Sequence, residues 1–326
     1  MNKSQIISTI ILFIGLISSC SEQTTKRNIV NIDNIDSIKT VIEFEKNVQE
    51  INISYLNKDV EFVGKMGTKI TLNPYSFVLD RMEVNNGDSI KVRLIECYTP
   101  SDIVKNRLST ECENKVIETA GMIYLGLESN GLQLKLKEKE KISVFFPKQK
   151  GKKEGMKLYY GKEEGTKLIW KGPVREEKEI KLPDTLYSET GNVVLHHNDL
   201  DYYLFDSYKL GWLNCDREMI DDATLLKVNL EKDISRYQPS MVLIFNDINS
   251  VCFSILEEGK MKFYGVPIGK SATIIGFASH NGTEYLYTDQ IIISKELVID
   301  AKFDVSTFDK IQNYIEDLQW GDYGSH

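Results

Sequence analysis

Residues 122–136, MIYLGLESNGLQLKL, are the stretch from which the fold of this chain follows. Two short apolar segments, 122–129 and 132–136, flank the dipeptide Asn130-Gly131. An Asn-Gly pair between such segments is the strongest short-range indication of a β-hairpin, because both residues readily adopt the backbone conformation that a tight turn requires. We therefore predict two antiparallel strands joined by a two-residue turn.

The same pattern repeats outward from this hairpin, in both halves of the sequence. The segment SIKVRLIECY (89–98) alternates cleanly, with Ile90, Val92 and Leu94 on one side, as expected for a half-buried strand. Further strand-like segments are 60–64, 68–72, 75–79, 142–147, 156–161 and 166–170 in the first half, and 225–230, 241–247, 251–259, 261–269, 271–279, 284–294 and 297–305 in the second. Short strands with turn residues at this spacing are typical of antiparallel β-sandwiches.

The whole chain is therefore expected to be mainly β, with two antiparallel β-sandwich domains and a short C-terminal helix. We predict an N-terminal β-sandwich over 48–172, a charged connector over 173–200, and a C-terminal β-sandwich plus helix over 201–326. The composition supports cores of this size, because 41% of the 326 residues are hydrophobic and 27% are charged, as in ordinary globular proteins.

Helical patterns occur in two places. Ser306, followed by Asp309 three residues later, predicts the start of the last helix. Its apolar stripe is expected to pack on the second sandwich, with a partner-binding surface as the alternative. The stripe consists of Phe308, Ile311, Ile315 and Leu318. A shorter helical insert is expected over 101–109, after Pro100 and with Ser101 as its N-cap.

The N-terminus carries the pattern of an export signal. A basic start at Lys3 precedes an apolar run from Ile6 to Ile17. This run is too short to cross the ~30 Å of a bilayer's hydrocarbon core, and it ends in small residues, as secretory signals do.

Residues 16–20, LISSC, resemble the lipobox of bacterial lipoproteins. The resemblance implies that a signal peptide, 1–19, is removed and that Cys20 is lipidated, so that 20–47 would form a lipidated tether. Because Ser21 follows the cysteine, the resemblance to Gram-negative lipoproteins favours the outer membrane. We therefore expect a protein of the cell envelope, held at the membrane through its lipid.

The charge balance argues against nucleic acid as a partner. The formal net charge is −8, whereas nucleic-acid-binding proteins present dense Lys and Arg patches. The one basic run, Lys148 to Lys153, is interpreted as a solvated loop. We expect a protein partner in the envelope instead.

Four cysteines follow Cys20, and an envelope location would allow them to form disulfides. Pairing within each expected domain would join Cys97 to Cys112 and Cys215 to Cys252. The alternative is four buried free thiols, because cysteine is also a small apolar core residue.

Aromatic residues gather at the start of the second half, where Tyr202, Tyr203, Tyr208 and Trp212 lie within eleven positions. They could form a binding surface for a sugar or a protein, or fill the inward positions of a sandwich. The adjacent Asp216 and Arg217 are interpreted as a structural ion pair.

Patterns of catalytic or metal-binding residues are weak. The stretch from Gly265 to Ser271 departs from a phosphate-binding loop and leads into β-branched residues, so we expect a hairpin connection there. His196 and His197 are interpreted as part of a polar loop, since two ligands alone do not make a closed metal site. We therefore expect no cofactor, no metal and no enzymatic activity.

Two family resemblances bear on function. GTKITLNPYSF (67–77), the block 118–136 and FFP (145–147) resemble a divergent β-sandwich of the zona-occludens/netrin-receptor type, over residues 60–147. GWLNCDR (211–217) resembles a block of uncharacterised bacterial lipoproteins. The first resemblance implies a β-sandwich fold and an interaction role, and the second supports one architecture for both halves. We therefore expect an envelope-anchored binding, assembly or structural protein. The alternative is a surface protein that binds or hydrolyses carbohydrate.

Overall fold

The computed structural model describes residues 47–54, 59–79, 82–83, 89–148, 153–164, 167–172 and 201–321. The predicted signal peptide, Cys20, all of the tether except Asn47, His196-His197 and the connector 173–200 lie outside the described residues, so these expectations stay predictions. Within the described residues the chain is mainly β, as predicted, with antiparallel sheets and a short C-terminal helix.

The first sandwich is built on an antiparallel sheet with the strand order β1-β6-β8-β15-β12-β13. Two short strands, β7 (Glu111–Cys112) and β9 (Leu132–Gln133), also pair with β8. The six main strands are β1 (Gln49–Ser54), β6 (Ser89–Cys97), β8 (Lys115–Ser129), β15 (Gly211–Glu218), β12 (Lys157–Glu164) and β13 (Lys167–Lys171).

A second sheet faces this one and closes the first core. Its order is β14-β11-β3-β2, and a small sheet of order β10-β4-β5 lies beside it. The strands are β2 (Val60–Val63), β3 (Lys69–Leu72), β11 (Ile142–Pro147) and β14 (Tyr202–Ser207), with β4 (Phe77–Leu79), β5 (Met82–Glu83) and β10 (Lys135–Leu136) in the small sheet. The alternation read from the sequence is confirmed, because Ile90, Val92 and Leu94 of β6 are all fully buried in the core between the sheets.

The second sandwich pairs a sheet of order β19-β20-β16-β23 with one of order β18-β17-β21-β22-β24. Its strands are β16 (Ala223–Leu230), β17 (Ser240–Phe245), β18 (Val251–Phe253), β19 (Ile255–Glu257), β20 (Lys260–Pro267), β21 (Ser271–His280), β22 (Thr283–Ile292), β23 (Val298–Ala301) and β24 (Asp304–Ser306). All described strand pairs are antiparallel except β16 with β23, which is parallel.

Both Asn-Gly hairpins are confirmed. Asn130 and Gly131 have φ values of 50° and 76° between β8 and β9, and Asn281 and Gly282 have φ values of 51° and 75° between β21 and β22. The expected hairpin at 265–271 is wrong: β20 and β21 belong to different sheets, so this segment crosses between the sheets.

The expected boundary before residue 201 also needs correction. β14 pairs with β11, and β15 lies between β8 and β12, so residues 202–218 complete the sheets of the first sandwich. The described chain passes from the first sandwich to the second between Glu218 and Ala223.

The N-caps of the two predicted helices lie one or two residues away from the predicted cap residues, Ser101 and Ser306. In α2 (Pro100–Lys105) the cap is Thr99, whose side chain accepts a hydrogen bond from Asp102 N while Asp102 caps Thr99 in return. In α4 (Phe308–Glu316) the cap is Thr307. Two further short helices are the 3-10 turn η1 (Pro74–Ser76) and α3 (Lys232–Arg236).

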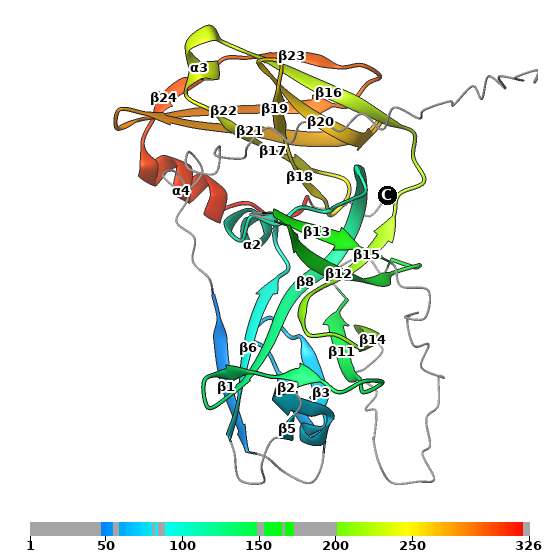
Figure 1. Cartoon of the computed structure of the whole chain (residues 1–326). Helices are drawn as coiled ribbons and strands as arrows, with labels where there is room; N and C mark the ends of the chain where they lie inside the picture. The colour runs from blue at the N-terminus through cyan, green and yellow to red at the C-terminus, as the bar shows by residue number, and fades with distance from the viewer. Residues whose placement is uncertain are drawn as a thin grey trace, which may run out of the picture. The chain divides into compact units, whose positions relative to one another are not determined.

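Helices α2 and α4 share a third core with parts of both sandwiches (Figure 1). Ile311 and Ile315 of α4 are fully buried there, as the predicted packing of the apolar stripe requires. The same core contains Ile95 of the first sandwich and Phe277 of the second. The two sandwiches are therefore joined through a common apolar layer.

Candidate functional site

The most unusual chemistry of the described chain lies where the two sandwiches meet, at the N-terminal end of the long strand β8 (Figure 1). Here the β7–β8 hairpin is hydrogen-bonded to the β17–β18 loop. Thr110 N donates to Val251 O (2.8 Å), Thr119 N donates to Asn249 O (2.9 Å), and Ser250 Oγ donates to Ile117 O (2.7 Å). Strand-like bonding therefore continues from one sandwich into the other. We call this region the junction.

Glu118 of β8 is the central charged group of the junction and is only 1% exposed. Its Oε2 accepts from Arg217 Nε (2.6 Å), and its Oε1 is bonded by Lys153 Nζ and accepts from Asn249 N (3.3 Å). A buried carboxylate without such partners would cost several kcal/mol. Burial lowers the pKa of Lys153, while its bond to Glu118 opposes that shift.

A second buried carboxylate, Asp216 of β15, lies close to this group. Asn214 Nδ2 donates to Asp216 Oδ2 (2.5 Å), and Thr119 Oγ1 donates to Asn214 Oδ1 (3.0 Å). Burial raises the pKa of Asp216 well above its usual range, and the nearby Glu118 raises it further. Both effects favour the neutral form of this carboxyl group.

The predicted ion pair between Asp216 and Arg217 is wrong. Neighbouring residues of a strand point to opposite faces, so Arg217 pairs with Glu118 while Asp216 turns into the interior. The Asp216 Oδ1 atom and the Tyr159 hydroxyl are both buried and make no hydrogen bond that meets geometric criteria within the described residues. Glu118 and Asp216 are 1% and 0% exposed, so a substrate cannot reach either carboxylate in this conformation.

A third buried carboxylate, Glu96 of β6, fastens the turn between β2 and β3. It accepts from Met66 N (2.9 Å), Thr68 N (3.0 Å) and Gln49 Nε2 (2.6 Å). Gly64 leaves room for this carboxylate, because a Cβ there would lie 2.5 Å from Glu96 Oε2. Glu96 therefore ties the start of β1 and the β2–β3 turn to the same point of the first sandwich.

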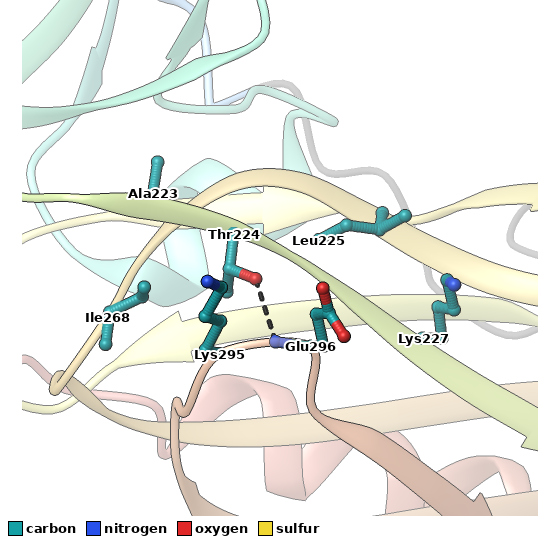
Figure 2. Close-up of a pocket in the computed structure, with 7 residues that line it drawn as sticks. All are labelled: Ala223, Thr224, Leu225, Lys227, Ile268, Lys295 and Glu296. Carbon is teal, nitrogen blue, oxygen red and sulfur yellow. Dashed lines mark hydrogen bonds between the residues drawn. The ribbon is translucent and has the colours of Figure 1, made fainter.

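The second sandwich has a shallow hollow of about 300 Å³ at one end (Figure 2). It is lined by Ala223, Thr224, Leu225, Lys227, Ile268, Lys295 and Glu296. Its floor is fixed by the hydrogen bond that Glu296 N donates to Thr224 Oγ1 (3.0 Å), which Figure 2 shows. Its volume is at the lower limit of typical ligand pockets, and three of its seven lining residues, Lys227, Lys295 and Glu296, are charged.

The predicted disulfides, Cys97–Cys112 and Cys215–Cys252, are not formed in the structure. Cys97, Cys112, Cys215 and Cys252 are all buried and outside any disulfide, which is the alternative arrangement that the sequence left open. The second expected pair is divided between cores, since Cys215 belongs to the core of the first sandwich and Cys252 to that of the second. Burial raises the pKa of the Cys112 thiol to about 11.

The four predicted aromatic residues do not form one exposed surface. Tyr203 is 2% exposed and belongs to the core of the first sandwich, whereas its neighbour Tyr202 points to the opposite face of β14. Trp212 packs edge-on against Tyr124 in the shared core, and only Tyr208 is well exposed. Most of this aromatic content therefore serves packing.

The basic run at 148–153 is not simply a solvated loop at its two described ends. Lys148 Nζ lies 5.2 Å from the centre of the Tyr203 ring, and Lys153 is half-buried and paired with Glu118. Sequence reasoning missed the junction residues Glu118, Lys153 and Asn249. The one available sign was a glutamate inside the apolar and small-residue run that forms β8.

Comparisons with protein-family models, with curated proteins and with solved structures found no match. Among the described residues, no group of three or more His, Cys, Asp or Glu side chains is arranged to hold a metal ion. None of the helices in the described part of the chain is long and apolar enough to cross a membrane.

Proposed function

We propose that this chain is an envelope lipoprotein, anchored through Cys20, that acts as a non-enzymatic binding or assembly scaffold. The sequence LISSC at 16–20 supports the anchor. The observation that carries the scaffold role is the junction, in which backbone hydrogen bonds, the bond from Asn249 N to the buried Glu118 and a shared apolar core join the two sandwiches.

A scaffold must present its surfaces in a fixed arrangement, and several contacts serve that purpose. Beyond the backbone bonds of the junction, Trp320 Nε1 donates to Tyr98 O (2.7 Å), and Lys105 of α2 pairs with Glu316 of α4 (3.2 Å). Separate domains on a flexible linker rarely bury a charge of one domain against the backbone of the other, as Glu118 is buried against Asn249 N, because that charge must then be desolvated at every closure.

The carboxylates of the junction favour a structural role over hydrolysis. A glycosidase places two carboxylates about 5–9 Å apart on either side of an open substrate site. Glu118 and Asp216 are instead closed off from solvent, and Glu118 is neutralised by two cations.

The anchor is tested by intact mass and fractionation after expression in a Gram-negative host. Acylation predicts a membrane-bound chain that begins at Cys20 and is heavier than its polypeptide mass by the mass of its acyl groups. Cys20→Ala is the matched control and should release the chain from the membrane. An unmodified Cys20 in the wild-type chain would reject the anchor, and turnover of polysaccharide by the purified protein would reject the non-enzymatic role.

A further inference from the structure

One end of the first sandwich carries a basic and apolar patch on its outer face. Phe62, Ile70 and Val144 point into the core, so the residues next to them on β2, β3 and β11 point outward. We define the patch by five residues: Val63, Lys65, Met66, Lys69 and Tyr202. Val63 and Met66 are large apolar side chains that are 53% and 40% exposed.

The lysine at the centre of the patch is held over aromatic rings. Lys69 Nζ lies 5.2 Å from the Tyr202 ring centre and 5.5 Å from that of Phe145. Val63 and Phe145 are the direct cross-strand neighbours of Lys69, so cation, rings and aliphatic surface are contiguous. Lys65 is exposed in the adjoining turn.

The N-terminal segment of the chain joins the body beside this patch. Lys65 N donates to Gln49 Oε1 (2.8 Å), and Gln49 Nε2 donates to Glu96. The described body begins at Asn47, two residues before Gln49, so residues 20–46 enter it close to the patch. A lipid on Cys20 would tether the chain to the bilayer through a segment that enters the body beside the patch.

We propose that the patch docks onto an anionic lipid surface and so orients the anchored body. This inference rests on the proposed function, since the lipid supplies the proximity. Lysines beside aromatic and aliphatic side chains suit the interface of a bilayer, where the apolar parts enter the headgroup region and the ammonium groups meet lipid phosphates. Each lysine near such a surface strengthens binding by about 1 kcal/mol, or about fivefold.

The charge of the rest of the chain makes this docking directional. The formal net charge is −8, so an anionic membrane repels the body as a whole and attracts it only where lysines gather. The acidic groups of the same sheet lie one row further from the turn. Glu61 is two residues before Val63, and Asp206 is already paired with Lys141 (2.5 Å).

The test measures how close the patch comes to lipid while the anchor is supplied artificially. The mature chain 20–326 with Cys20→Ser and an N-terminal hexahistidine tag is held on vesicles that contain nickel-chelating lipid. An environment-sensitive dye is attached through Met66→Cys, or through Leu132→Cys as the control at the exposed β9 turn. Unsubstituted protein shows that the four buried native cysteines stay unlabelled.

Lipid-borne quencher should reduce the emission of the dye at position 66 and leave position 132 unaffected, on vesicles with 30% anionic lipid. Lys65→Gln should lower the ratio of docked to undocked chains about fivefold. Lys260→Gln, which removes an exposed lysine of the second sandwich, is the matched control and should leave that ratio unchanged.

Equal quenching at the two dye positions, or no difference between Lys65→Gln and Lys260→Gln, would overturn the proposal. Protection of position 66 only by an added envelope protein would also overturn it, in favour of a protein partner. Because the tag replaces the acyl group, none of these outcomes depends on acylation. The intact mass of the native chain decides the proposed anchor separately.

Discussion

Glu118 is the group on which the stability of the junction most depends. In Glu118→Gln the side chain keeps its shape, but Arg217 and Lys153 lose the carboxylate that neutralises them. Removing one member of a buried ion pair typically costs about 3–5 kcal/mol. Because the Arg217 side chain is 36% exposed and keeps part of its hydration, we expect the lower end of that range, about 3 kcal/mol.

The loss is measured by urea and thermal unfolding of the mature chain. For about 300 residues that unfold as one unit, with an unfolding entropy of about 0.6 kcal/mol/K, about 3 kcal/mol corresponds to a fall in Tm of roughly 5 °C. Far-UV circular dichroism and tryptophan fluorescence should report the same midpoint, because Trp170 and Trp320 lie in or against the core that both sandwiches share. The two signals together therefore report whether the sandwiches unfold as one unit.

Glu128→Gln is the matched control. Its carboxylate pairs with Arg93 at 3.1 Å, but Arg93 is 42% exposed and Glu128 is 28% exposed. Such a solvated pair contributes about 0–1 kcal/mol. Equal effects of the two substitutions, or two separate transitions in the unsubstituted protein, would refute the view that the buried Glu118 helps to fasten the sandwiches into one unit.

Three further predictions concern Asp216, the four cysteines and Gly265. The raised pKa of Asp216 means that the folded chain binds a proton that the unfolded chain releases above its usual pKa of 3.8. Stability should therefore fall as pH rises from that value toward the folded pKa, and Asp216→Asn should flatten this dependence in Tm measured between pH 4 and 8; an unchanged slope would contradict it. Cys97, Cys112, Cys215 and Cys252 should resist iodoacetamide in the native protein and all react in denaturant, and a mass showing fewer than four free thiols would contradict the buried-thiol arrangement. Gly265→Ala would place a Cβ 1.9 Å from Asn114 O at a φ of +64°. Its control is Gly269→Ala, where φ is +84° and no atom lies within 4 Å, so that only about 1–2 kcal/mol of backbone strain is expected. Gly265→Ala should lower Tm more than Gly269→Ala, and equal losses in Tm would show that the close approach to Asn114 is relieved.

Local features of the fold could be predicted because they depend on neighbouring residues. The alternation of β6 and the two Asn-Gly turns follow from the two-residue period of a strand and from turn conformations. The helix caps were displaced because several residues of similar capping strength stand together. Thr99 is chosen over Ser101, and Thr307 over Ser306.

The candidate site could not be predicted because its members are far apart in the sequence. Lys153, Arg217 and Asn249 lie 35, 99 and 131 residues from Glu118. A pattern can show that a glutamate interrupts an apolar strand, but the cations that neutralise it are found only by folding. The same reason made the basic run around Lys153 look solvated, since its charge is compensated from a distant strand.

The misplaced domain boundary shows most clearly what determines the architecture. Composition suggested that the first sandwich ends before the charged connector 173–200, but hydrogen-bond partners decide which sheet a strand joins. β15 lies between β8 and β12, so the first sheet is interrupted in its middle without residues 211–218. The same strand carries Arg217, which completes the charge cluster at the junction. The segment after the connector therefore closes the first sandwich and fastens it to the second, and the chain cannot be divided at the connector without removing both functions.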